Sequence, residues 1–385
     1  MIKSTATFAL ATAAALSASA AFDATFQVRT ASYNIRCQTT ESDSTNNWDN
    51  RKVDFINLVK TIAPDVVGFQ EVKNAQYTYL RGQLSGYTFV GEMRAGGSNP
   101  EATPVAFRTS RFALLDSGTF WLSATPNVSG STAWGNGIED SGYPRICSWT
   151  LLKDRTSGGV FCFASTHLDL NTGPRLAGIQ LILSLLVAKY EAVDVPVVLV
   201  GDMNALETED SMIEATMAMQ DALLVSKTTP TGSWRTFNGF SWKDDEVSSA
   251  SALADYTAAQ RSANVATLGK RIDYIFTSFG AEVESFATRN DARPGKQYYP
   301  SDHYPVVADL RLPRANSFYT GKVRIEIGKS VERVGHGRYV LTRGANLPNA
   351  DNLEFVLPNW VERAAVEDGE IVIYARPAPF FLRIR

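Results

Sequence analysis

The stretch that most constrains the fold is residues 195–204, Val-Pro-Val-Val-Leu-Val-Gly-Asp-Met-Asn. Its aliphatic run has the length and composition of a strand buried on both faces, and Gly201 is expected to let the chain turn where the strand ends. Asp202 and Asn204 are two residues apart, so an extended backbone directs both side chains to one side. The sequence therefore predicts a carboxylate and a carboxamide at the tip of a rigid strand, on which other polar groups converge.

Residues 1–20 have the features of a secretory signal. Lys3 supplies a positive charge, Phe8 to Leu16 form a short apolar core, and Ala18-Ser19-Ala20 fits a cleavage site of small residues. The alternative is a membrane anchor, but the apolar run is shorter than the roughly 20 residues that a bilayer requires. We therefore expect a secreted or periplasmic protein without a transmembrane segment.

Net charge and cysteine content limit the possible functions. The 385-residue chain has a formal net charge of −3 and no evident basic patch, which argues against charge-driven grip on nucleic acid. A nuclease that relies on a metal and a few arginines stays possible. Cys37, Cys147 and Cys162 allow at most one disulfide, and the sequence does not indicate which pair; Cys162, in an apolar run, is expected to be a core residue.

Strand and helix patterns alternate as far as Pro313. A helix is expected from about residue 50 to 63, with Val53, Ile56, Val59 and Ile62 on its buried face, and others near residues 73–84, 174–190 and 208–219. Strands are expected near residues 30–36, 65–72, 87–92, 104–107, 112–122, 145–153, 160–166, 195–200, 271–276, 282–288 and 304–312. Acids at the strand ends of such a mixture predict an α/β sandwich with its site at one edge of the sheets.

The composition changes after Pro313, and residues 314–385 are expected to form a small all-β module. Short alternating segments there predict strands near residues 323–327, 339–342, 353–356, 370–374 and 380–384. The module either binds a glycan, cell wall or protein partner, or packs as a structural cap.

Six short motifs place polar groups where an apolar strand begins or ends. Taken singly, each is an ordinary helix cap or solvated turn. The motifs are Asn34, Glu71, His167 with Asp169, Asp202 with Asn204, Asp273, and Asp302 with His303.

Together and in this order, the motifs resemble those of the endonuclease/exonuclease/phosphatase superfamily. That superfamily includes pancreatic-type deoxyribonuclease, apurinic/apyrimidinic endonucleases, sphingomyelinases and inositol polyphosphate 5-phosphatases. The resemblance covers residues 28–312 and is greatest to a secreted bacterial branch, through WDNR at 48–51 and SGTFWLS at 117–123. It implies a four-layer sandwich of two mixed β-sheets flanked by helices, with the catalytic domain over residues 21–313.

The resemblance also implies a divalent metal site, with Mg²⁺ expected and Mn²⁺ as the alternative. Glu71 is the principal ligand, and Asn34 and Asp302 complete the shell directly or through water. Hard oxygen donors of this kind suit Mg²⁺ independently of the resemblance, and zinc is disfavoured because no cysteine cluster is present.

The remaining motif residues have implied roles at the phosphate. Asp202 orients or deprotonates the attacking water, and Asn204 holds either the phosphate or Asp202. His303 contacts the phosphate with Asp273 on its other ring nitrogen, and His167 is a second donor. Asp169 either orients His167 or caps the following turn. Arg145 and Arg36 are the candidates for binding the substrate.

The sequence thus predicts a secreted Mg²⁺-dependent phosphoesterase that uses in-line water attack, with nuclease-type activity slightly favoured. The alternatives are a phospholipid or sphingomyelin-type phosphodiesterase, a small-molecule phosphatase and, outside enzymes, an inactive binding protein that keeps the fold. Loops around Trp48, residues 94–103 and residues 228–265 are expected to rim the site. Four aromatic side chains there either stack on the substrate or pack in the core: Trp234, Phe237, Phe240 and Trp242.

Overall fold

The computed structural model describes residues 25–95, 99–191, 194–241, 258–264, 269–296 and 298–314, together with five strands beyond them. The predicted signal therefore lies outside the described residues, as do Trp242 and the strand expected near residues 380–384. Among the described residues, no helix combines the length and apolarity needed to cross a membrane.

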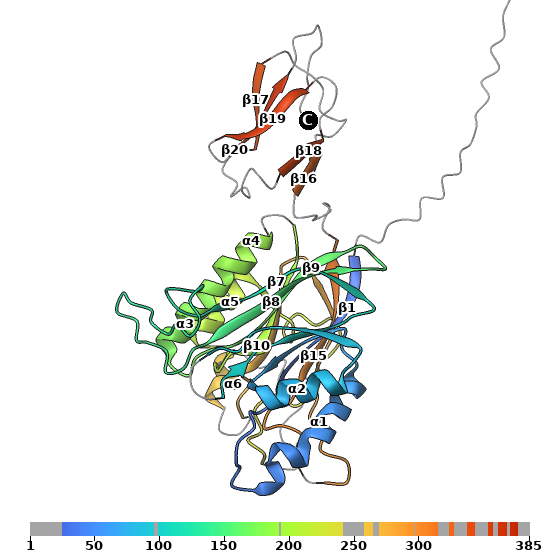
Figure 1. Ribbon diagram of the computed structural model, residues 1–385, viewed down its shortest axis with the longest axis vertical. Coiled ribbons are helices and arrows are strands. Elements are labelled where there is room, and N and C mark those ends of the chain that lie inside the picture. The colour runs from blue at the N-terminus through green and yellow to red at the C-terminus, as the bar shows by residue number, and fades with distance from the viewer. Residues whose placement is uncertain are drawn as a thin grey trace, which may run out of the picture.

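Two mixed β-sheets form the centre of the molecule (Figure 1). The first has the order β12(Thr231–Gly232), β14(Glu282–Thr288), β15(Val306–Pro313), β1(Thr25–Asn34), β2(Val66–Gln70), β6(Val105–Arg108), β4(Tyr87–Val90). The second has the order β11(Gln220–Asp221), β13(Asp273–Thr277), β10(Val197–Asp202), β9(Val160–His167), β8(Ile146–Asp154), β7(Phe112–Trp121). In each sheet one central pair is parallel, β1 with β2 and β9 with β10.

Helices cover the outer face of each sheet, so the predicted four-layer sandwich is confirmed. Figure 1 shows α1(Trp48–Ile62) and α2(Asn74–Gln83) on one side. On the other side lie α3(Thr172–Ile182), a π-helical turn at Leu183–Val187, α4(Ala188–Glu191) and α5(Asp210–Ala218). Shorter elements are a 3₁₀ turn at Ser44–Asn46, α6(Ala258–Ala263), and the paired β3(Val72–Lys73) and β5(Glu101–Ala102).

The apolar run of β10 is buried on both faces, as predicted. Val198 and Val200 join the core between the two sheets, while Val197 and Leu199 join the core beneath α3 and α5. A third core lies between the first sheet and α1 and α2. Burial on both faces explains why the central strands read as continuous apolar runs rather than alternating ones.

Gly201 has a different role from the one expected. It lies within β10 rather than at a turn, and it is absent from the residues with positive φ. A Cβ atom at this position would lie 2.2 Å from the carbonyl oxygen of Thr166 on β9. The glycine is therefore required because two strands approach closely next to the site.

Val53 was expected on the buried face of α1, but its side chain is 57% exposed. Ile56, Val59 and Ile62 are buried as predicted, and Phe55 is fully buried with them. At 100° per residue, Val53 lies roughly 150° from the centre of this buried arc, so the chosen spacing included one residue on the opposite side.

The five described strands after residue 314 are β16(Val323–Glu326), β17(Gly337–Thr342), β18(Leu353–Val356), β19(Val361–Glu367) and β20(Glu370–Ala375). β16 pairs with β18, and β20 lies between β17 and β19. Four of the five expected strands are therefore present. β19 was not predicted, because its sequence, Val-Glu-Arg-Ala-Ala-Val-Glu, does not alternate between apolar and polar residues.

The fully buried Arg51 of α1 ties the helix to two segments of the site. Its guanidinium donates to the carbonyls of Ile35 at 2.6 Å, Arg36 at 2.6 Å and Pro300 at 3.1 Å. It also lies 4.9 Å from the ring centroid of Trp48, which is buried in the core. Arg51 thus fixes the backbone directly before Cys37 and Ser301.

We expect Arg51→Met to lower the free energy of unfolding by at least about 2 kcal/mol, because several buried carbonyls would lose their donor. Urea unfolding followed by circular dichroism would measure the change. Lys60→Met removes the same charge from an exposed position of the same helix and should cost less than about 0.5 kcal/mol. Equal effects of the two substitutions would contradict this role for Arg51.

Candidate active site

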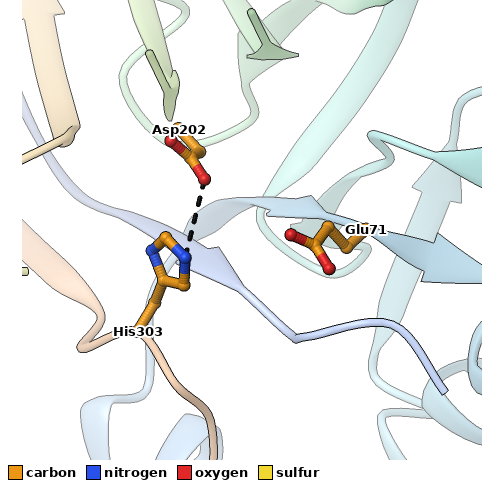
Figure 2. Close-up of side chains that lie close together, drawn as sticks. All are labelled: Glu71, Asp202 and His303. Carbon is orange, nitrogen blue, oxygen red and sulfur yellow. Dashed lines mark ion pairs between the residues drawn. The ribbon is translucent and has the colours of Figure 1, made fainter. Parts of the chain in front are cut away.

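The predicted motifs meet where the central strands of the two sheets end. In the second sheet, Asp202 is in register with His167 on one side and with Asp273 on the other. In the first sheet, Asn34 ends β1 and Glu71 directly follows β2. Ligand atoms of Glu71, Asp202 and His303 lie within 4.8 Å of one another, and Figure 2 shows the three side chains converging.

These residues line a pocket of about 540 Å³. Its polar and charged lining residues are Arg36, Cys37, Glu71, Arg94, Glu101, Tyr143, Arg145, His167, Asp202, Asn204, Lys270, Asp302 and His303, with Leu170, Phe237 and Ile272 as the apolar ones. Eight of the ten predicted site residues are therefore on the wall. The other two, Asn34 and Asp273, are buried directly behind it.

Asn34 connects the two sheets through its side-chain amide. Its Nδ2 donates to Glu71 Oε1 at 3.0 Å and to Asp202 Oδ2 at 2.9 Å. Its Oδ1 accepts from the backbone N–H of Arg36 at 2.9 Å. In this orientation Asn34 offers no oxygen toward Glu71, so the geometry favours positioning of the two carboxylates over direct ligation of a metal.

Glu71 is held with its carboxylate facing the pocket. Its backbone has a φ of 62°, an uncommon conformation for a residue other than glycine, which turns the chain at the end of β2. Its Oε2 accepts from the backbone N–H of Cys37 at 3.0 Å. Partial burial acts to raise the pKa of Glu71, but the Cys37 N–H, the Asn34 amide and the charge of His303 favour the ionised carboxylate, so its pKa lies below the ordinary value. Glu71 is thus ionised at neutral pH.

His303 is buried between two carboxylates. Its Nδ1 lies 2.8 Å from Asp273 Oδ2, and its Nε2 lies 3.6 Å from Asp202 Oδ2 (dashed in Figure 2). Burial opposes the charge, but Asp273 and Asp202 together raise the pKa of His303 well above its ordinary value. A doubly protonated ring has no free lone pair, so His303 is a hydrogen-bond donor in the pocket and not a metal ligand.

His167 is the neutral counterpart. Burial, and then the nearby Arg145, lower the pKa of His167 well below its ordinary value. Its Nε2 lies 3.5 Å from Asp202 Oδ2. The two imidazoles therefore flank the same carboxylate oxygen in different charge states.

Asp202 lies at the centre of the set. Burial, followed by the carboxylates of Asp273 and Glu71, raises its pKa to about 7 despite the opposing effect of His303. The backbone N–H of Asn204 donates to Asp202 Oδ1 at 3.0 Å, and the Asn204 side chain donates to Leu168 O at 3.0 Å. Asn204 thus contacts Asp202 through its backbone, and it also lines the pocket.

Asp169 caps a turn. Its Oδ1 accepts from the backbone N–H of Asn171 at 2.9 Å, and its Oδ2 lies 4.0 Å from Arg145 Nε. The alternative in which Asp169 orients His167 has no contact to support it among the described side chains. Arg145 is buried beside the pocket, and its Nε has no hydrogen-bond partner there.

Arg36 and Asp302 lie close together in the pocket lining. Arg36 Nε lies 2.9 Å from Glu41 Oε1 and 3.7 Å from Asp302 Oδ2. Burial is the main cause that raises the pKa of Asp302. Arg36 is therefore already paired with one carboxylate, whereas Asp302 lies near a cation without a close hydrogen bond to it.

Sequence reasoning did not name Arg94, Glu101, Tyr143 and Lys270, which also line the pocket. Two of them fall in the loop 94–103 that was expected to rim the site, and Phe237 confirms part of the loop 228–265. Trp234, in contrast, is core packing. Cys37, Cys147 and Cys162 are all free thiols, and burial raises the pKa of Cys37 to about 12.

A model of the endonuclease/exonuclease/phosphatase family matches residues 31–303, which include the whole set of converging side chains. The chain belongs to this family. Its members are hydrolases that act on phosphoesters and generally depend on a divalent metal, so this chain is a phosphoesterase of that family.

Solved structures and one sequence relative resemble the chain over most of its length. A Bacteroides vulgatus family member is 29% identical with a TM-score of 0.62, covering 74% of this chain and 99% of that one. A Bacteroides thetaiotaomicron mannosyl-6-phosphatase is 27% identical with a TM-score of 0.60, covering 74% and 99%. Protein L388 of Acanthamoeba polyphaga mimivirus is 26% identical over 287 residues, covering 70% of this chain and 94% of that one.

The raised pKa of Asp202 has a consequence for stability. Between its ordinary pKa of 3.8 and its folded value near 7, the folded state binds the proton and the unfolded state does not, so stability falls as pH rises. In chelator, the unfolding free energy of the wild type should therefore drop by about 2–3 kcal/mol relative to Asp202→Asn between pH 5 and pH 8. Urea titrations between pH 5 and pH 8 would measure the unfolding free energies of both proteins. A difference between wild type and Asp202→Asn that does not change with pH would contradict the raised pKa of Asp202.

Proposed function

We propose that this protein is an exported, Mg²⁺-dependent hydrolase that cleaves the P–O bond of a compact phosphoester by in-line attack of water. The observation that carries the proposal is the position of Asp202 Oδ2, which lies 3.5 Å from His167, 3.6 Å from His303 and 2.9 Å from the Asn34 amide that also holds Glu71. A proton acceptor, two hydrogen-bond donors for the phosphate and a carboxylate that can bind a metal thus lie close enough together to contact one phosphate group.

The donor set fits a hard divalent cation. Glu71 is ionised and faces the pocket, and Asp302 offers a second carboxylate nearby. Oxygen ligands and space for water suit Mg²⁺, while Mn²⁺ would accept the same ligands. When bound there, Mg²⁺ would polarise a phosphoryl oxygen and offset the charge of the leaving oxygen.

The protein side chains supply the remaining chemistry. Asp202, as the carboxylate, orients a water molecule and accepts its proton while the water oxygen forms a bond to phosphorus. The P–O bond on the opposite side breaks, and the leaving oxygen is protonated from solvent. The His303 imidazolium, fixed by Asp273, and the guanidinium of Arg145 stabilise the charge on the phosphoryl oxygens.

The size and charge of the pocket favour a small substrate over a polymer. Its volume of about 540 Å³ suits a single small molecule, and its cationic residues are balanced by acidic ones. The Bacteroides mannosyl-6-phosphatase, which aligns over nearly its whole chain, supports a phosphomonoester in particular. We therefore place small-molecule phosphatase activity before nuclease or lipid phosphodiesterase activity.

A phosphoester panel tests this proposal. With Mg²⁺, the purified mature protein should hydrolyse small phosphomonoesters faster than plasmid DNA, RNA, sphingomyelin or bis-p-nitrophenyl phosphate, and EDTA should abolish turnover. Glu71→Ala and His303→Ala should each lower kcat/KM at least about 100-fold. Glu92→Ala, an exposed acid outside the pocket lining, is the matched control and should leave the rate unchanged.

Two results would overturn the proposal. Full activity in EDTA would rule out the metal, and lack of turnover of every phosphoester would favour a binding protein that keeps the fold. Faster hydrolysis of DNA or RNA would make nuclease activity the main function.

Export is proposed from residues 1–20 and is tested separately. Mass spectrometry of protein recovered from the periplasm or medium of a bacterial host should find an N-terminus at Ala21, after the Ala18-Ser19-Ala20 site. An intact Met1 in the cytosolic fraction would contradict export.

A further inference from the structure

One wall of the pocket has no part in the proposed attack by water. It is formed by Arg94, Glu101 and Tyr143, and it continues into a small recess beside Glu71. Arg145 and His167 also line this recess, whereas Asp202 and Asn204 do not. Because the leaving group departs opposite the attacking water, we assign to the leaving group the wall next to Glu71, whose recess Asp202 does not line.

The wall is firmly built. Arg94 Nη1 lies 2.9 Å from Glu101 Oε2, and both side chains are mostly buried, with 14% and 16% exposed. The indole N–H of Trp121 donates to the carbonyl of Arg94 at 2.6 Å. Glu101 pairs in register with Lys73, two residues after Glu71. The position of this wall is thus tied through a short β-ladder to the metal-binding carboxylate.

The chemistry of the wall matches hydroxyl groups. The carboxylate of Glu101 accepts hydrogen bonds from hydroxyls, and the guanidinium of Arg94 donates to them. Tyr143 is 60% exposed, with the Arg94 guanidinium 5.3 Å from its ring centroid, and it offers an aromatic surface for the C–H face of a sugar ring.

A phosphorylated leaving group fits less well. A second phosphate would meet the negative charge of Glu101, which already offsets Arg94.

We propose that Arg94, Glu101 and Tyr143 form a subsite for a hydroxyl-bearing leaving group, so that the substrate is a phosphomonoester of a sugar or related polyol. The inference rests on the proposed function and deepens it. The reaction consumes one water: its oxygen bonds to phosphorus, the sugar C–O–P bridge breaks at the P–O bond, and the sugar leaves as a free hydroxyl with inorganic phosphate.

The test compares a hydroxyl-rich substrate with one that lacks hydroxyls. For the mature protein with Mg²⁺, kcat/KM would be measured on a hexose 6-phosphate, a nucleoside 5′-monophosphate and p-nitrophenyl phosphate. The variants are Glu101→Gln, Tyr143→Ala, and the control Glu139→Gln on the loop that carries Tyr143. Glu139 is exposed and lies outside the pocket lining. Thermal unfolding would verify folding, and Tyr143→Ala changes a largely exposed side chain in any case.

The wild type should prefer the hexose 6-phosphate over both other substrates. Glu101→Gln and Tyr143→Ala should each lower the ratio of kcat/KM for hexose 6-phosphate to that for p-nitrophenyl phosphate at least 10-fold, and Glu139→Gln should leave it within 2-fold. An unchanged ratio in both variants, or a preference for the nucleotide, would overturn the subsite while phosphoesterase activity persists. Lack of hydrolysis of all three substrates would overturn the proposed function as well.

Discussion

The site depends on how the charge of four neighbouring carboxylates is offset. Glu71, Asp202, Asp273 and Asp302 end or precede strands at one edge of the sandwich, and all but Glu71 are buried. Placing several carboxylates together away from water is costly unless cations or hydrogen bonds compensate them. The His303 ring lies beside the carboxylates of Asp202 and Asp273. The Asn34 amide donates hydrogen bonds to Asp202 and Glu71, so Asp202 is compensated by both groups. The charge that remains is what makes the pocket suitable for a divalent cation.

The same compensation explains why fold and site are inseparable. The Asn34 amide reaches from β1 of one sheet to Asp202 on β10 of the other, so its geometry depends on how closely the sheets pack. Gly68 sets this distance, because a Cβ atom there would lie 2.5 Å from a methyl group of Val200. Arg51 in turn fixes the backbone around Arg36 and Pro300. Large substitutions in the inter-sheet core should therefore alter the site without touching it.

Much of this arrangement could be predicted from the sequence, because strand ends carry a local signal. The apolar run 195–200 followed by Asp202, and the ordered recurrence of similar runs, indicated both the sandwich and the convergence of Asn34, Glu71, His167 and His303. The signal is local because a strand buried on both faces appears in the sequence as an uninterrupted apolar run, and a polar residue marks where this run ends.

Other features of the site depend on tertiary contacts that produce no repeating pattern in the sequence. The Arg94–Glu101 ion pair and the exposed Tyr143 belong to irregular loops, where residue type does not indicate which partner is met. The orientation of the Asn34 amide, the turn cap by Asp169 and the close approach at Gly201 are decided by neighbouring strands. Val53 shows a different kind of error: the helix that contains it was predicted correctly, but Val53 was placed on the buried face and is exposed.

We propose that Asp202 acts between two imidazoles that differ in protonation state, and nuclear magnetic resonance of the ring nitrogens distinguishes the two states. In ¹⁵N-histidine-labelled protein with EDTA at pH 7, His303→Gln and His167→Gln variants would assign the signals. We expect two protonated ring nitrogens for His303 and one for His167. A neutral His303, or a doubly protonated His167, would show that Asp202 does not lie between rings of different charge.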